Sequence, residues 1–177
     1  VYLISPNEIQ SDFYNLLEKV LSAKNIKFFQ LRLKKSDKNK IIKIAKNIRK
    51  ITKKHNVKFI INDNPIISKI VNADGCHLGQ NDGSIVIAKK YLKRKIVGVT
   101  CHNSKLFAKN AIRNKADYLA FGSFNKSKLK PNARKANLTI LKWAKKNIKK
   151  PIVAIGGINN LNYKKILKSG AKYIAIS

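Results

Sequence analysis

The chain has 177 residues, of which 39 are Lys or Arg and only 8 are Asp or Glu, so its formal net charge is +31. Hydrophobic residues make up 44%, which is ordinary globular usage and excludes an intrinsically disordered chain. No run reaches the roughly 18 apolar residues of a membrane span, the first residues lack a secretory pattern, and two isolated cysteines fit a reducing cytoplasm. We therefore expect one cytoplasmic domain over residues 1–177, with no membrane partner.

Eight short apolar, β-branched runs recur along the chain, with amphipathic stretches between them. In chain order the runs are Val1–Ser5, Lys27–Leu31, Val57–Ile61, Gly75–Leu78, Ile96–Val99, Tyr118–Phe121, Ile152–Ile155 and Tyr173–Ile176. The clearest helical pattern runs from Ile41 to Ile51, where the apolar residues share one face. Strands alternating with helices indicate βαβ units around a parallel sheet. Eight units predict a (β/α)₈ TIM barrel, and because the chain stops at the eighth run, we expect it to lack the last helix.

Two of the rare acids follow neighbouring predicted strands. Asp63 comes after the third strand and Asp82 after the fourth, and Arg32, Lys34 and Lys130 follow other strands. The active site of a (β/α)₈ barrel lies at these carboxyl ends. Mg²⁺ prefers one or two carboxylates together with phosphate oxygens and water, and cations neutralise the remaining phosphate charge. The pattern therefore predicts a magnesium site that holds a diphosphate.

Helix capping is the alternative role for both acids. Asp63 would cap a helix that begins near Pro65, and Asp82 would cap one that begins near Ser84. Because the two acids stand at adjacent strand ends with cations opposite, we favour the metal site.

Other polar and glycine positions suggest two further roles. Asp74 and Asp117 precede the fourth and sixth strands, at the opposite end of the barrel, where residues are expected to serve stability. Gly156 and Gly157 follow the seventh strand and lead toward a helix predicted from Asn159, so their N–H groups are expected to hold a second phosphate.

These segments together resemble the thiamine phosphate synthase family, which also contains the thiazole tautomerases. The matching segments are Tyr2–Ile4, Gln30–Lys34, Ile61–Asp63, Ala73–Asp82, Gly98–His102, Ala116–Tyr118, Lys130 and Ala154–Ile158. They span the chain in order, and the segment from Asp74 to Asp82 is the most specific. The resemblance implies condensation of a hydroxymethylpyrimidine diphosphate with a thiazole phosphate, which gives thiamine phosphate and pyrophosphate. It also implies that pyrophosphate leaves first and that the thiazole nitrogen captures the resulting cation.

The resemblance further implies a role for each matching residue. Asp63 and Asp82 would bind Mg²⁺. The diphosphate would be held by Arg32, Lys34, Asn62 and Lys130. Gln30 would contact the pyrimidine, and Thr100 stands where the family usually has Ser near the reaction centre. The thiazole phosphate would be bound by Ser127, Gly157 and Ser177. The residues expected to act in catalysis are Arg32, Lys34, Thr100 and Lys130.

Three alternatives stay open. A thiazole tautomerase typically lacks the second metal carboxylate, so Asp82 favours the synthase. An inactive homologue is suggested by Leu129, which stands where the family commonly has Thr, and by the early end of the chain. A basic nucleic-acid-binding protein is suggested by the net charge. However, only five of the basic residues are Arg, the lysines are spread along the chain, and the only Trp, Trp143, lies on a predicted buried helix face. We therefore expect small phosphorylated substrates and no nucleic acid as partners.

Overall fold

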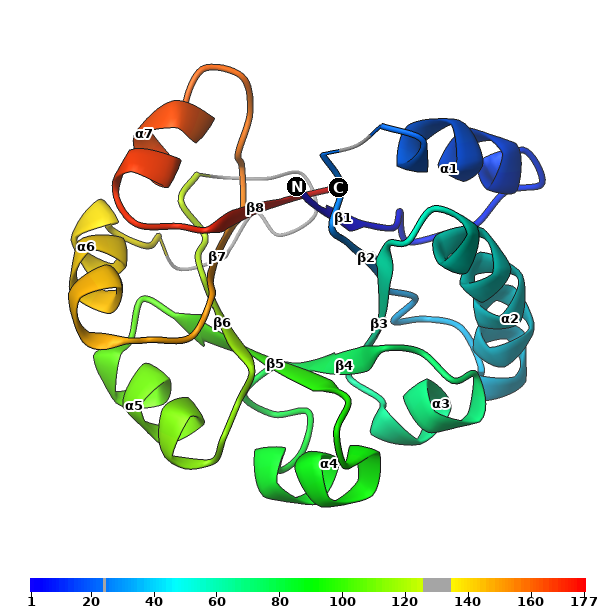
Figure 1. The fold of residues 1–177 in the computed structure, drawn as a ribbon, viewed down its shortest axis with the longest axis horizontal. Coiled ribbons are helices and arrows are strands. Elements are labelled where there is room, and N and C mark those ends of the chain that lie inside the picture. Colours follow the sequence, from blue (N-terminus) through cyan, green and yellow to red (C-terminus); the bar gives the residue numbers. More distant parts are fainter. Residues whose placement is uncertain (24, 126–134) are drawn as a thin grey trace.

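The computed structural model, which describes residues 1–23, 25–125 and 135–177, contains a closed barrel of eight parallel strands surrounded by helices (Figure 1). The strands are β1 (Tyr2–Ile4), β2 (Phe28–Leu31), β3 (Lys58–Asn62), β4 (Gly75–Leu78), β5 (Ile96–His102), β6 (Tyr118–Phe121), β7 (Ile152–Ile155) and β8 (Tyr173–Ile176). The helices are α1 (Phe13–Leu21), α2 (Lys38–Lys54), α3 (Pro65–Ile70), α4 (Ile85–Leu92), α5 (Lys105–Arg113), α6 (Leu138–Asn147) and α7 (Tyr163–Lys168).

The strands follow one another around the barrel in chain order, and β8 pairs with β1 to close it. Figure 1 accordingly shows β8 next to β1. The element order ends with β8, and the predicted (β/α)₈ TIM barrel is confirmed.

Most strands bury both of their faces, which explains why the apolar runs are nearly continuous. In β3, Ile60 points into the barrel and packs with Tyr2 and Tyr118, whereas Phe59 and Ile61 belong to the layer between barrel and helices. Alternate side chains of a strand point to opposite faces, so a strand covered on both sides carries apolar residues at successive positions.

The first residues of α3 and α4 show whether Asp63 and Asp82 act as helix caps. Asn64 caps α3, because its Oδ1 accepts from the Ile67 N–H at 2.9 Å, and Ser84 caps α4 through its Oγ and the Ile87 N–H at 3.4 Å. The capping roles considered for Asp63 and Asp82 are therefore wrong. Neither carboxylate serves as a helix cap.

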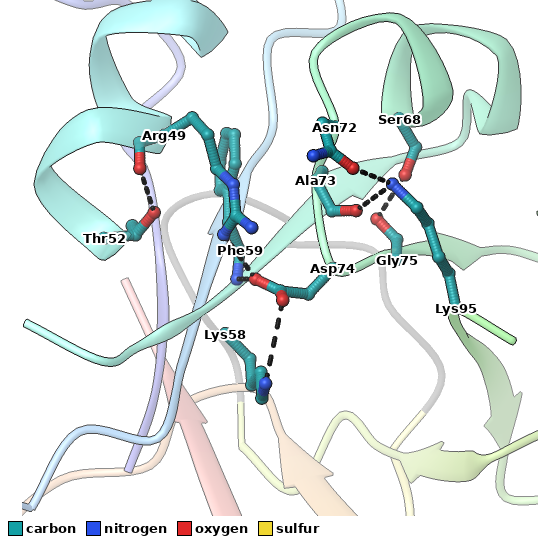
Figure 2. Close-up of polar contacts among 10 residues, drawn as sticks. All are labelled: Arg49, Thr52, Lys58, Phe59, Ser68, Asn72, Ala73, Asp74, Gly75 and Lys95. Atoms are coloured by element: carbon teal, nitrogen blue, oxygen red, sulfur yellow. Dashed lines mark hydrogen bonds and ion pairs between the residues drawn. The ribbon is translucent and has the colours of Figure 1, made fainter. Parts of the chain in front are cut away.

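Asp74, directly before β4, ties a helix and a strand together at the amino-terminal end of the barrel. Its Oδ2 accepts from Arg49 Nη1 of α2 at 2.7 Å and from the Phe59 N–H of β3 at 2.8 Å (Figure 2). Lys58 Nζ lies 3.7 Å from the other carboxylate oxygen. Lys95 holds the segment directly before Asp74, since its Nζ donates to the Ala73 carbonyl at 2.8 Å.

Asp117 repeats this arrangement before β6. Its Oδ2 accepts from the Val97 N–H of β5 at 2.7 Å and from Lys89 Nζ of α4 at 2.8 Å. Each of the two acids thus satisfies a backbone donor of the preceding strand and pairs with a cation of a surrounding helix. These contacts fit the stability role predicted for both.

Two further findings bear on the alternative classes of protein. Trp143 of α6, predicted on a buried helix face, is partly buried against the core between barrel and helices, and Lys105 Nζ lies 5.7 Å from its ring centre. Among the described residues, no helix is long and apolar enough to cross a membrane.

Candidate functional site

Most of the predicted site residues lie where the strands end, at the carboxyl-terminal rim of the barrel. In chain order they are Gln30 in β2, Arg32 and Lys34 after it, Asn62 at the end of β3, Asp63, Asp82 after β4, Thr100 in β5, Gly157 after β7 and Ser177 after β8. The two others, Ser127 and Lys130, lie outside the described residues.

Asp63 is the centre of a small charged cluster on this rim. Its Oδ2 lies 3.1 Å from Lys34 Nζ. Partial burial, followed by the hydrogen bond and negative charge of the neighbouring Asp82 carboxyl, raises the pKa of Asp63, and the nearby Lys34 opposes the rise. Asp82 is held by its own turn, where its Oδ2 accepts from the Gly79 N–H at 2.9 Å. The structure therefore brings together both predicted metal ligands and one predicted phosphate-binding cation.

This cluster fits a hard divalent cation. Two adjacent carboxylates repel each other unless a proton or a cation lies between them. The described part of the chain holds no group of three or more His, Cys, Asp or Glu side chains that could bind a metal. Mg²⁺ matches such a site, because it commonly uses one or two carboxylates and takes its other oxygens from substrate phosphate and water.

Arg32 is held in place by the segment after β1, which the sequence had not connected with the site. The Arg32 N–H donates to Ser5 Oγ at 2.9 Å, and its Nη1 donates to Asn7 Oδ1 at 3.3 Å. The only sequence signal for Ser5 and Asn7 is their position directly after the first strand.

Gln30 and Asn62 form a second contact among the predicted residues. Gln30 is 3% exposed, and its Nε2 donates to Asn62 Oδ1 at 2.6 Å. Thr100 is engaged separately, by a hydrogen bond of 2.8 Å between its Oγ1 and Nε2 of His77. Sequence reasoning noted that His77, at a strand end, could contact a substrate, but a lone His there is more often structural, and neither His77 nor Tyr118 was predicted as a site residue.

Gly157 follows β7, and Ser177 follows the neighbouring strand β8. Gly157 has a φ of 62°, and a Cβ there would lie 2.5 Å from Cβ of Asn125. The position therefore requires glycine.

The helix predicted to begin at Asn159 begins instead at Tyr163, as α7. Asn162 Nδ2 donates to the Gly157 carbonyl at 2.8 Å and the Asn159 N–H donates to Asn162 Oδ1 at 2.9 Å, which makes the connecting segment a separate turn. The prediction that the two glycines lead directly into a helix N-terminus was therefore wrong. A phosphate site at Gly157 would depend on the turn itself.

The closed barrel with charged residues on its carboxyl-terminal rim places the protein among the (β/α)₈-barrel enzymes. A family model described as thiamine monophosphate synthase matches residues 1–177, and the chain belongs to this family.

Known proteins with the same family name are similar over nearly the whole chain. The chain is 58% identical over 179 aligned positions to a thiamine-phosphate synthase of Pelagibacter ubique, covering 100% of this chain and 86% of that protein. It is 38% identical to a thiamine-phosphate synthase of Erythrobacter litoralis, covering 100% of this chain and 85% of that protein.

A solved structure described as thiamine phosphate pyrophosphorylase from Pyrococcus furiosus superposes with a TM-score of 0.88 at 30% identity, covering 99% of this chain and 83% of that one. The family resemblance is thus confirmed, and the chain is an enzyme of the thiamine-phosphate synthase family. Neither the tautomerase nor the inactive alternative is favoured.

Proposed function

We propose that this chain makes thiamine phosphate from a hydroxymethylpyrimidine diphosphate and a thiazole phosphate, with release of diphosphate and dependence on Mg²⁺. The observation that carries the proposal is the rim cluster of Asp63, Asp82 and Lys34, whose acids are not helix caps. Two carboxylates beside a cation suit a substrate that carries a diphosphate. The free thiols of the buried Cys76 and Cys101 are compatible with work in the cytoplasm.

Asp63 and Asp82 are the residues that would hold Mg²⁺. The metal, when bound, would neutralise charge on the diphosphate and so make it a better leaving group. Lys34 lies beside Asp63, and Arg32 lies on the same rim of the barrel. Both would supply positive charge for the phosphate oxygens that the metal does not contact. Lys130 is proposed for the same task and Ser127 for the thiazole phosphate, on the family resemblance alone.

The proposed reaction exchanges one bond for another. The bond between the pyrimidine methylene carbon and the diphosphate oxygen breaks, and its electron pair leaves with the diphosphate. The thiazole ring nitrogen then donates its lone pair to the methylene cation, which forms the new carbon–nitrogen bond. No group has to remove a proton in this sequence. The protein is therefore expected to contribute mainly by stabilising the leaving group and positioning the two substrates.

The other rim residues are proposed to position the substrates. Gln30 and Asn62, joined by a hydrogen bond, would contact the pyrimidine and the diphosphate respectively. Thr100 would stand near the reacting carbon. Gly157 and Ser177, which follow the neighbouring strands β7 and β8, would bind the thiazole phosphate.

The direct test is synthesis by the purified full-length protein. With saturating amounts of both substrates and Mg²⁺, we expect thiamine phosphate and diphosphate in equal amounts, and we expect a chelator in excess to stop the reaction until Mg²⁺ is restored. If no thiamine phosphate is formed under these conditions, the proposal is refuted. Turnover that persists after thorough removal of divalent cations would refute the metal role alone.

A further inference from the structure

A continuous line of hydrogen bonds crosses the interior of the barrel and joins two sides of the proposed site. Thr100 Oγ1 and His77 Nε2 are 2.8 Å apart, and His77 Nδ1 and the Tyr118 hydroxyl are also 2.8 Å apart. The Tyr118 and Tyr2 hydroxyls are 2.7 Å apart, and the Tyr2 hydroxyl donates to Gln30 Oε1 at 2.9 Å. Gln30 Nε2 then donates to Asn62 Oδ1. We call these six residues the interior chain.

The direction of every bond in the interior chain follows from the Gln30 end. The Gln30 Oε1 atom can only accept, so Tyr2 uses its single hydroxyl hydrogen there. Tyr118 must therefore donate to the Tyr2 oxygen, which uses the only hydrogen of Tyr118. As a result, the Tyr118 oxygen can only accept from His77, and His77 must carry a hydrogen on Nδ1.

The Thr100 end is determined by the same reasoning. In a neutral imidazole with a hydrogen on Nδ1, the other nitrogen is an acceptor. The Thr100 hydroxyl must then donate to His77 Nε2. Its hydrogen is used inside the barrel, so its oxygen can serve a further partner only as an acceptor, while Gln30 retains a second N–H as a donor.

The middle of the interior chain lies deep and is closely packed. Tyr2 and Tyr118 are the first residues of their strands and are 2% and 3% exposed, whereas Asn62 and Thr100 lie near the rim. Burial is the largest cause that raises the pKa of both tyrosines, so both hydroxyls keep their hydrogens. Gly98 makes room for the Tyr118 ring, because a Cβ at that position would lie 1.9 Å from the ring.

We propose that Tyr118 is a positioning residue: it carries the hydrogen-bond direction set at Gln30 and Tyr2 on to His77 and fixes the tautomer of His77. Thr100 is thereby presented to the pyrimidine substrate as an acceptor, next to Gln30 as a donor. This inference rests on the proposed function. An aminopyrimidine carries an amino group that donates and ring nitrogens that accept, so it complements this pair of groups. Tyr118 acts through Tyr2 on one side and through His77 on the other, without touching the substrate.

The first test measures the tautomer in the protein without ligands. The nitrogen chemical shifts of ¹⁵N-labelled histidine distinguish the two neutral tautomers, and a His77→Gln variant assigns the signal among the three histidines. At mildly alkaline pH we expect His77 to carry its hydrogen on Nδ1. The Thr100→Val variant should keep that tautomer because Tyr118 still accepts, and Tyr118→Phe should give a mixture. A wild-type His77 with its hydrogen on Nε2 would overturn the inference.

The second test measures the Michaelis constants of the two substrates separately. Tyr118→Phe should raise KM for the pyrimidine diphosphate about tenfold, as expected for one lost hydrogen bond, and leave KM for the thiazole phosphate within about twofold. Tyr173→Phe is the matched control, since its ring also packs on Phe28 but lies outside the interior chain, and both constants should stay unchanged.

An equal change of both constants in Tyr118→Phe, or an unchanged constant for the pyrimidine diphosphate, would refute the positioning role. If the wild-type protein makes no thiamine phosphate, the proposed function fails, whereas the tautomer measurement still decides the direction of the interior chain.

Discussion

The two ends of the barrel each carry a pair of aspartates, and the two pairs have opposite surroundings. At the amino-terminal end, each of Asp74 and Asp117 accepts a hydrogen from a backbone N–H and pairs with a cation of a helix. At the carboxyl-terminal rim, Asp63 and Asp82 lie against each other. Asp82 accepts from the Gly79 N–H, and among the described residues only Asp63 of this pair has a cation partner, Lys34.

This difference separates stability from function in the same fold. A carboxylate that accepts a hydrogen bond from a backbone N–H and pairs with a cation is stable in its ionised form. A partly buried carboxylate beside another one is unfavourable until something positive joins it, and here burial and Asp82 raise the pKa of Asp63. The barrel thus places its satisfied acids at the end opposite the proposed site and its repelling acids where a substrate and a cation would meet.

The largest expected effect comes from Asp82→Asn. The substitution removes one proposed metal ligand and keeps the size of the side chain. We expect kcat/KM for thiamine phosphate synthesis to fall by about 10²–10³-fold, the usual cost of removing one electrostatic contact to a developing charge. Steady-state rates measured over a range of Mg²⁺ concentrations check this prediction.

Asp37→Asn is the control for Asp82→Asn. Asp37 caps α2, where its Oδ1 accepts from the Lys40 N–H at 2.9 Å, and Asn caps a helix about as well. This variant should keep its activity. A near-normal rate in Asp82→Asn would show that Asp82 is not a metal ligand.

The second prediction addresses the other end of the barrel. Asp74→Ala leaves the Phe59 N–H without its partner and removes the ion pair with Arg49. We expect the free energy of unfolding to fall by about 2–3 kcal/mol, as for a hydrogen bond to a charged group, while kcat well below the melting temperature stays unchanged. Urea unfolding checks the stability, and a loss of activity in the folded variant would contradict the division between the two ends.

Sequence reasoning predicted the fold and the placement of both acid pairs, because these depend on local order. Apolar runs locate the strands, and an acid directly before or after a run lies at a known end of the barrel. This reasoning placed Asp74 and Asp117 at one end and Asp63 and Asp82 at the other without any knowledge of their contacts.

Features that depend on non-local contacts or on exact backbone angles could not be predicted. The caps are Asn64 and Ser84, which lie one and two residues beyond the acids considered for that role, and only the backbone geometry decides between such neighbours. The interior chain was missed because Tyr2 and Tyr118 stand in apolar runs 116 residues apart, and their contact appears only when β1 and β6 face each other across the closed barrel.

A smaller effect with the opposite sign is expected for Asp63→Asn in metal-free protein. Because the folded-state pKa of Asp63 lies above the ordinary value of 3.8, the ionised carboxylate costs stability at neutral pH. Removing the charge should raise the free energy of unfolding by up to about 1 kcal/mol while activity is lost.

The gain in Asp63→Asn should shrink as the pH falls toward 3.8, where wild-type Asp63 becomes protonated in the folded and then in the unfolded state. Thermal unfolding of the wild type and the variant, in the presence of a chelator and at several pH values, measures this difference in stability. A variant less stable than wild type at neutral pH would mean that the ion pair with Lys34 outweighs the repulsion from Asp82.

The smallest effect is expected for Lys58→Ala, which separates the two cations that approach Asp74. Lys58 Nζ lies 3.7 Å from Oδ1 and its side chain is 55% exposed, whereas Arg49 Nη1 lies 2.7 Å from Oδ2 and its side chain is 24% exposed. Exposed ion pairs contribute little because water and salt screen them, so Lys58→Ala should lower the free energy of unfolding by no more than about 0.5 kcal/mol.

Arg49→Ala should lower the free energy of unfolding by about 2 kcal/mol, because it removes a short hydrogen bond to a charged group. Equal losses in the two variants would show that net positive charge near Asp74, and not the hydrogen bond from Arg49, stabilises this end of the barrel.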